Sequence, residues 1–241
     1  ECALHFMMAQ IGNDIATLQK QIFFCFNAEE NELELPVGAA RTASGVMLAG
    51  FLAGRLYEAW SLLRERTHSE VYGRYESDMP PEGHEALAKI KRYFKRDNLV
   101  QRIRMKLAFH TDLTVVQQTY EQLDDDQAFT DYIAEQNGNT HYHGAATLNA
   151  IAMARLTGEK DFAAGLNKVI TELPPLGGLV TDYVQIFLIV FLKRYVGPSW
   201  EEAKRRAISF DAPRLKTIRM PYFCEAQREE LATLDDDKNW G

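Results

Sequence analysis

Apolar residues recur at helical spacing along most of the chain. Near the N-terminus they fall three or four positions apart, at Ile11, Ile15, Leu18, Ile22 and Phe26, which places them on one face of a helix over residues 4–27. Valine and isoleucine do not alternate with polar residues over the length of a strand. The pattern therefore predicts an all-α protein in which the helices pack as a multi-helix bundle.

Breaks in this pattern divide the rest of the chain into further elements. A long helix is expected over 35–66, and a loop over 69–81 because Gly73, Pro80 and Pro81 interrupt the pattern. Asp97 is expected to cap a helix that ends at Phe109, and the Pro174–Pro175 pair to end another. The further helices are expected over 81–96, 97–109, 113–123, 126–136, 140–156, 160–171, 176–196 and 200–208.

One domain is expected over residues 1–241, because no internal repeat or low-complexity block divides the chain. The Asn137–Gly138–Asn139 break is the best candidate for a seam, with both halves sharing one core. The acidic tail, residues 225–241, is expected to be flexible.

Composition is that of an ordinary soluble protein, with 46% hydrophobic and 25% charged residues. Cys2, Cys25 and Cys224 share no close spacing, which argues against a disulfide framework or a CxxC-type zinc site and favours the reducing cytoplasm. No signal peptide is visible, although the chain begins at Glu1. The most apolar run, Ile186–Leu192, is far shorter than the roughly 20 residues of a bilayer span, so no membrane location is expected.

Positive charge is concentrated in one window of an acidic chain. Lys89–Lys106 holds eight Lys or Arg residues and a single acid, Asp97, whereas the whole chain carries a net charge of −7. Such a concentration is typical of an anion or nucleic-acid site. On its first helix Lys89, Arg92 and Arg96 share a face, while the aromatic residues between these cations are expected to belong to the core rather than to stack on bases.

Arg104, near the end of this window, and His110, just after it, are the candidate catalytic pair. An arginine can hold a phosphate, and a histidine with a pKa near neutrality can exchange a proton with a ribose 2′-hydroxyl. Six residues on an ideal helix separate the two side chains by about 120°. They converge only if the helix loosens near Phe109 or a second subunit contributes its copy. The alternative is a surface arginine and a histidine at a helix C-terminus.

The run IRMKLAFHTD resembles the signature of HEPN-type helical proteins, in which a histidine follows an arginine after four to six residues. The match rests on Arg104, Lys106, Ala108, Phe109 and His110. The segments LAGRLYEAW (residues 52–60) and GNTHY (residues 138–142) also resemble bacterial proteins of this kind. The resemblance covers about the first two thirds of the chain, and the signature itself is short.

The resemblance implies a helical bundle, a homodimer with facing motifs, and RNase activity that uses no metal ion or cofactor. It also implies a cytoplasmic role in toxin–antitoxin, phage-defence or CRISPR-associated systems. Arg104 and His110 would be catalytic, and Arg102 and Lys106 would be further contacts to the RNA substrate. Met105 departs from the family pattern, because the residue after the arginine is commonly polar.

Two other classes of function remain open. A non-catalytic helical module that binds a protein or a nucleic acid is favoured by Met105 and by the net charge of −7. A small-molecule enzyme would need a pocket between helices, but no residue set identifies one. Gly-rich phosphate loops, Ser–His–Asp patterns and HExxH motifs are absent from the sequence.

Three smaller patterns have structural interpretations. His141 and His143 could bind a metal ion, but a loop leading into a helix capped by Thr140 is favoured. The run 124–126 resembles a cation site, yet a helix end followed by an N-cap explains it more simply. Gly50 and Gly54 on the second long helix predict a close helix contact, and Glu58 could pair with Arg104.

Overall fold

The chain is described by a computed structural model at residues 1–26, 35–108, 112–123, 128–135, 139–197, 199, 211–214, 218 and 222–223. Its helices are α1 (Cys2–Phe26), α2 (Leu35–Arg64), α3 (Arg66–Tyr75), α4 (Pro81–Phe94), α5 (Leu99–Ile103), α6 (Leu113–Tyr120), α7 (His143–Arg155) and α8 (Phe162–Val196). Two short turns join them, the 3-10 turn η2 (Glu76–Asp78) and the π-helical turn η3 (Arg104–Ala108). The prediction of an all-α multi-helix bundle is confirmed.

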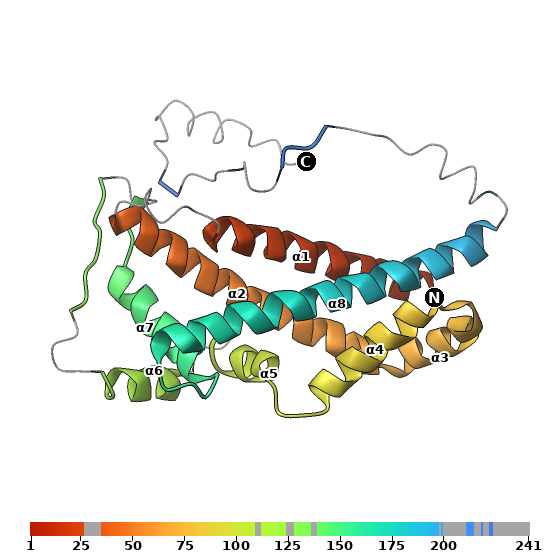
Figure 1. Cartoon of the computed structure of the whole chain (residues 1–241), viewed down its shortest axis with the longest axis horizontal. Coiled ribbons are helices and arrows are strands. Elements are labelled where there is room, and N and C mark those ends of the chain that lie inside the picture. The colour runs from red at the N-terminus through yellow and green to blue at the C-terminus, as the bar shows by residue number, and fades with distance from the viewer. Residues whose placement is uncertain are drawn as a thin grey trace, which may run out of the picture.

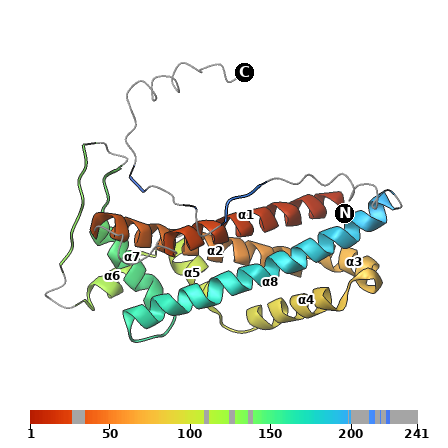
Figure 2. The same ribbon diagram turned by 45° about the horizontal axis from the view of Figure 1, so that its top comes forward.

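Helix α8 runs the length of the bundle and packs against α1, α2, α4 and α7 (Figure 1). Helices α3 and α4 lie at one end of α8, and α6 and α7 lie at the other, an arrangement that the turned view repeats (Figure 2). The N-terminus lies beside the last turns of α8, where the Cys2 thiol is 3.7 Å from the hydroxyl of Tyr195. Buried residues from α1 to α8 form one hydrophobic cluster.

Helix α3 occupies part of the segment for which the sequence predicted a loop. Its buried face is formed by His68, Val71 and Tyr75, which follow each other at helical spacing. Gly73 lies on the exposed side, where a single glycine costs about 1 kcal/mol, less than the burial of that face contributes. His68 is 2% exposed, and its Nε2 lies 2.8 Å from the hydroxyl of Tyr183 on α8.

Helix α8 passes through Pro174 and Pro175 without a break, so the prediction of two helices is wrong. Each proline removes a backbone donor and costs about 3 kcal/mol inside a helix. Burial of apolar side chains on both sides, such as Leu173 and Leu176, opposes that cost. The Gln19 side chain also donates a 2.7 Å hydrogen bond to the carbonyl of Pro174.

Because α8 is continuous, the apolar run Ile186–Leu192 is part of a much longer apolar helix than the sequence predicted. That run belongs to a 35-residue helix whose most apolar window has a mean hydropathy of 1.7, and α2 from Pro36 reaches 1.2. Both helices are long and apolar enough to cross a bilayer, and 44% of each window is buried in the bundle. Length and composition are weak evidence for a membrane location, because core helices of helical bundles share them.

The chain between α6 and α7 is not helical where it is described. Residues 128–135 are extended, and Tyr132 exchanges two backbone hydrogen bonds of 2.9 and 2.8 Å with His141. The predicted helix over 126–136 is therefore wrong for these residues. The acidic run 124–126, the expected helix 200–208 and the tail 225–241 lie outside the described residues, as do Gly138 and Asn137 of the candidate seam.

Candidate functional site

Helix α5 and the turn η3 carry the basic residues of the sequence motif. Asn98, rather than the expected Asp97, caps α5, because its side-chain oxygen accepts a 2.9 Å hydrogen bond from the backbone nitrogen of Gln101. After Ile103 the α-helix widens into the π-helical turn Arg104–Ala108. π-Helical turns are rare in proteins, and many of those that occur lie at functional sites. This turn precedes Phe109, where the Arg104–His110 pair requires the helix to loosen and which lies outside the described residues.

Arg104 is held by an aromatic ring and not by an acid. Its guanidinium carbon lies 4.7 Å from the centroid of the Tyr57 ring on α2, within the range of a cation–π interaction. The Arg104 Nε is buried and has no hydrogen-bond partner. Among the described residues none forms an ion pair with Arg104, and Glu58, the acid beside Tyr57, is exposed. Arg104 is a half-buried cation whose donors face no protein acceptor in this part of the chain.

The two neighbouring cations are paired. Lys106 Nζ lies 2.7 Å from Asp112 Oδ2, and Arg102 Nε lies 3.8 Å from Asp97 Oδ1. The hydrogen bond from Lys106 is the main cause that lowers the pKa of Asp112 below its usual range. Lys106 is therefore hydrogen-bonded to a carboxylate, whereas Arg102 only lies near one and its buried Nε, like that of Arg104, has no hydrogen-bond partner.

Asp112 and Lys106 delimit the segment that contains His110. Besides the ion pair, the backbone nitrogen of Asp112 donates a 3.0 Å hydrogen bond to the carbonyl of Lys106. The other carboxylate oxygen of Asp112 accepts a 3.0 Å bond from Thr114 nitrogen and caps α6. Phe109 and His110 fall between Lys106 and Asp112 in the sequence and lie outside the described residues.

Turn η3 packs on α2 close to a glycine of the predicted small-residue pair. A methyl group added at Gly50 would lie 3.8 Å from Ala108 Cα, an ordinary contact distance. Gly50 is therefore not required by close packing. A closer approach occurs at Gly45, where an added methyl would overlap the Phe26 ring of α1.

The aromatic residues of the basic helix α4 belong to the core, as expected. Phe94 is buried and stacks on Trp60 of α2, with ring centroids 5.0 Å apart and planes inclined by 4°. Tyr93 donates a 2.6 Å hydrogen bond to Glu172 on α8, and burial is the main cause that raises the pKa of the Tyr93 phenol. The cations of α4 lie on its exposed face.

The histidine pair near α7 forms a ring cluster. His141 is buried, and its ring is nearly parallel to that of Tyr132, with the ring centroids 6.3 Å apart. The centroids of the His141 and His143 rings are 5.7 Å apart. No group of three metal-ligating side chains occurs among the residues that the structure describes. Thr140 does not cap α7; instead the carboxylate of Asp131 accepts a 3.1 Å bond from the nitrogen of Gly144.

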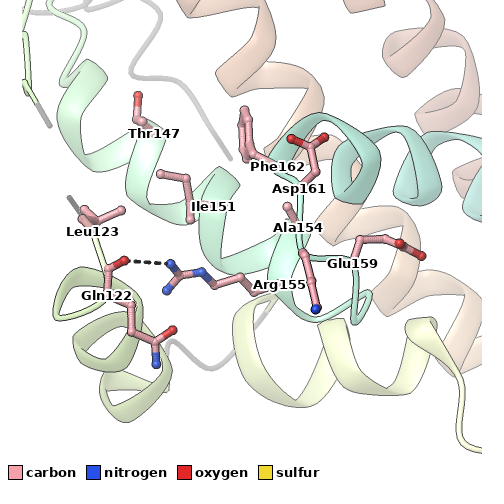
Figure 3. A pocket seen from close by; sticks show the side chains of 10 residues that line it. Gln122, Leu123, Thr147, Ile151, Ala154, Arg155, Glu159, Asp161 and Phe162 are labelled. Atoms are coloured by element: carbon pink, nitrogen blue, oxygen red, sulfur yellow. Dashed lines mark hydrogen bonds between the residues drawn. The ribbon is translucent and has the colours of Figure 1, made fainter.

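A hollow of about 370 Å³ lies between α6, α7 and the start of α8 (Figure 3). Arg155 on its wall donates hydrogen bonds to the carbonyls of Thr119 and Gln122, at 3.0 and 3.3 Å. These hydrogen bonds satisfy carbonyl groups at the C-terminal end of α6, and they use donors of the Arg155 guanidinium that could otherwise bind a ligand. The remaining wall contains Glu159, Asp161 and Thr147, and the Thr147 hydroxyl lies 3.4 Å from Nε2 of His143.

No protein-family model matches the chain, and no curated protein or solved structure matches it at a significant level. The structure adds Tyr57 and Asp112 to the candidate site, and neither was selected from the sequence. Tyr57 lies within the LAGRLYEAW segment, and its position three residues before Trp60 on one face of α2 was the available signal.

Proposed function

We propose that the chain is an HEPN-like helical protein that cleaves RNA without a metal ion, or a relative of such an enzyme. The proposal is carried by one observation: Arg104 is a half-buried guanidinium on the Tyr57 ring with no acidic partner among the described residues. A cation in that condition favours an external anion, because a partly desolvated site strengthens the attraction. The Arg-x5-His spacing resembles the HEPN signature, and this resemblance is the reason for proposing RNA cleavage as the reaction.

In the proposed reaction the ribose 2′-hydroxyl attacks the adjacent phosphorus. The bond from phosphorus to the 5′-oxygen of the next nucleotide breaks, and a 2′,3′-cyclic phosphate forms. One base accepts the proton of the 2′-hydroxyl, and one acid returns a proton to the leaving oxygen. His110 supplies one of these roles. Arg104 binds the phosphate oxygens in a forked geometry and stabilises their growing charge.

Arg102 and Lys106 are assigned a secondary role in this proposal. Each faces a carboxylate, Asp97 and Asp112 respectively, so part of its charge is neutralised before RNA binds. Their removal should weaken RNA binding more than it slows cleavage. A homodimer that brings two Arg104–His110 pairs to one cleft, in a cytoplasmic toxin–antitoxin or defence system, completes the proposal.

The test is cleavage of a labelled RNA by the purified protein in EDTA. Arg104→Ala and His110→Ala should each lower the rate by about 100-fold or more, which is the usual contribution of a proton-transfer group or a phosphate ligand. Arg66→Ala on α3, an exposed position far along the chain from η3, is the control and should cleave at the wild-type rate. Cleavage that persists at that rate in both Arg104→Ala and His110→Ala would exclude the mechanism.

A non-catalytic RNA-binding or protein-binding module is the second candidate, and Met105 supports it. Its side chain is 53% exposed beside Arg104, at the position where the family pattern has a polar residue. A thioether cannot donate a hydrogen bond to phosphate. Tight, salt-sensitive RNA binding with no turnover would favour this candidate, and turnover restored by Met105→Asn would identify Met105 as the reason for its loss. Failure to bind RNA at low salt would favour a protein partner.

A further inference from the structure

The eight basic residues of the window Lys89–Lys106 fall into two groups. Three face carboxylates: Lys89 with Glu85 at 2.7 Å, Arg102 with Asp97, and Lys106 with Asp112. The other five form no ion pair with a described residue. One of these is Arg104, and the remaining four lie together at the end of α4. They are Lys91, Arg92, Lys95 and Arg96, called the α4 tetrad below.

The α4 tetrad forms one surface. Lys91 and Arg92 lie in the last turn of α4, Lys95 is its C-cap and Arg96 follows in a bend, so the four cations lie within six residues at this helix end. All four residues are exposed. The acid nearest in sequence, Asp97, faces Arg102, and Glu172 beneath Tyr93 accepts the hydrogen bond of that phenol.

The tetrad is joined to the Arg104 site through α2. Tyr57 and Trp60 lie three residues apart on one face of that helix. Arg104 lies over Tyr57, while Trp60 stacks on Phe94, the residue that lies between the members of the tetrad in sequence. Arg64 lies 5.5 Å over the same Trp60 ring and adds a further cation at this contact. Turn η3 and the end of α4 are therefore neighbours on the α2 surface.

A lipid surface or a protein partner fits the tetrad less well than a phosphate chain. A helix that lies on a membrane inserts its apolar face, but the apolar face of α4, including Leu87, Ile90 and Phe94, is buried in the core. Protein interfaces contain an apolar centre with few lysines, and the four exposed residues here are all cations. Closely spaced Lys and Arg residues bind a phosphate backbone by neutralising its charge and releasing its counterions.

We propose that the α4 tetrad is a docking surface for the phosphate backbone of single-stranded RNA, separate from the Arg104 site where cleavage is proposed. This inference rests on the proposed function for the identity of the polyanion. The tetrad contributes to the affinity and salt dependence of RNA binding. The chemical step is assigned to Arg104 and His110 and not to the tetrad.

The test measures binding and cleavage separately. A labelled 2′-O-methyl RNA oligonucleotide, which lacks the attacking hydroxyl, is titrated with the protein between about 50 and 200 mM salt. The tetrad variant carries Lys91→Gln, Arg92→Gln, Lys95→Gln and Arg96→Gln. A charge-matched control carries Lys20→Gln, Arg66→Gln, Lys160→Gln and Lys193→Gln, four exposed positions on other parts of the molecule.

The tetrad variant should lose at least about tenfold in affinity at the lowest salt, and its salt slope should fall by up to about 3, since each phosphate contact contributes about 0.7. The control should retain the wild-type slope. A charge-retaining variant, Lys91→Arg, Arg92→Lys, Lys95→Arg and Arg96→Lys, should also retain it, which separates lost charge from misfolding. Equal losses in the tetrad variant and the control, or no loss in either, would overturn the docking surface.

Cleavage of unmodified RNA distinguishes this inference from the proposed function. If cleavage requires Arg104 but binding does not require the tetrad, the docking surface is excluded and the proposed RNase activity stands. If binding requires the tetrad but no RNA is cleaved, the docking surface stands and the proposed RNase activity is excluded. If both stand, the tetrad variant should have a raised KM with kcat within about twofold of wild type, the result expected when only substrate binding is lost.

Discussion

The guanidinium carbon of Arg104 lies 4.7 Å from the centroid of the Tyr57 ring, and this contact links the turn η3 to α2. A cation held by a ring keeps its hydrogen-bond donors available, whereas a cation held by a carboxylate does not. Tyr57 thus fixes the orientation of Arg104 while leaving its charge for a ligand. The same arrangement explains why a half-buried arginine is tolerated here without an acidic neighbour.

The contact predicts a measurable coupling between the two residues in folding. In a double-mutant cycle with Tyr57→Leu and Arg104→Gln, the coupling free energy should be about 0.5–1 kcal/mol, the usual size of a partly exposed cation–π pair. Urea unfolding of the four proteins supplies the values. Tyr57→Phe keeps the ring and serves as the control, so it should retain most of the coupling. A coupling near zero would mean that the ring does not hold Arg104.

Helix α8 offers a matched pair of glycine substitutions. A methyl group at Gly165 would lie 2.7 Å from Ala154 Cβ and 2.8 Å from its carbonyl oxygen, whereas at Gly178 it would meet nothing within 4 Å. Gly165→Ala should therefore destabilise the protein by about 1–3 kcal/mol, and Gly178→Ala should stabilise it by about 0.5–1 kcal/mol. Thermal unfolding followed by circular dichroism checks both. Equal effects would show that α7 and α8 do not approach as described.

His68 predicts a pH dependence of stability. Burial, with a smaller effect of Lys91, lowers the pKa of His68 to about 4, compared with about 6.5 in the unfolded chain. Between these values the unfolded state binds a proton that the native state does not. The free energy of unfolding should thus be fully retained above about pH 6.5 and fall by about 3 kcal/mol toward pH 4.

The control for His68 removes the titrating group and its partner together. In His68→Phe with Tyr183→Phe no buried hydroxyl loses its acceptor, because the 2.8 Å contact is replaced on both sides. Urea unfolding at several pH values should show a shallower acid loss in the double variant than in wild type. Identical pH profiles would contradict the assignment of this loss to His68.

Two substitutions of Asp112 distinguish the contribution of its helix cap to stability from the contribution of its ion pair. Asp112→Asn keeps an oxygen that can accept the Thr114 hydrogen bond but removes the charge opposite Lys106, so the free energy of unfolding should change little. Asp112→Ala also removes the cap and should be the less stable of the two variants. Chemical denaturation distinguishes them. If the asparagine variant is as unstable as the alanine variant, the ion pair and not the cap stabilises this region.

The sequence predicted the regular helices well, because long periodic segments report the face that is buried. It failed at α3 and α8, where Gly73, Pro174 and Pro175 were given more weight than the apolar positions around them. Local breakers have a fixed cost, but the opposing burial depends on tertiary partners such as Gln19, which lies 155 residues before Pro174. Such partners are not visible in a local window.

The candidate site was predictable in part for the same reason. The charge window and Arg104 are local features, and they were found. The ring beneath Arg104 comes from α2, and the cap of α7 comes from Asp131, a residue in an extended segment. Both partners are distant in sequence, and neither contact has a spacing that a motif search could use. The pairing of Lys106 with Asp112 could have been predicted, because both residues lie in the run IRMKLAFHTD.

Turn η3 and helix α5 are supported mainly by α2, while α2 itself is also packed against α1, α7 and α8. A segment with one principal support can open locally while the rest of the protein stays folded. Amide hydrogens of residues 104–108 should accordingly exchange with solvent sooner than those in the middle of α2 or α8. The arginine-bearing turn would then be a separate unit of local unfolding, able to adjust to a ligand without global rearrangement.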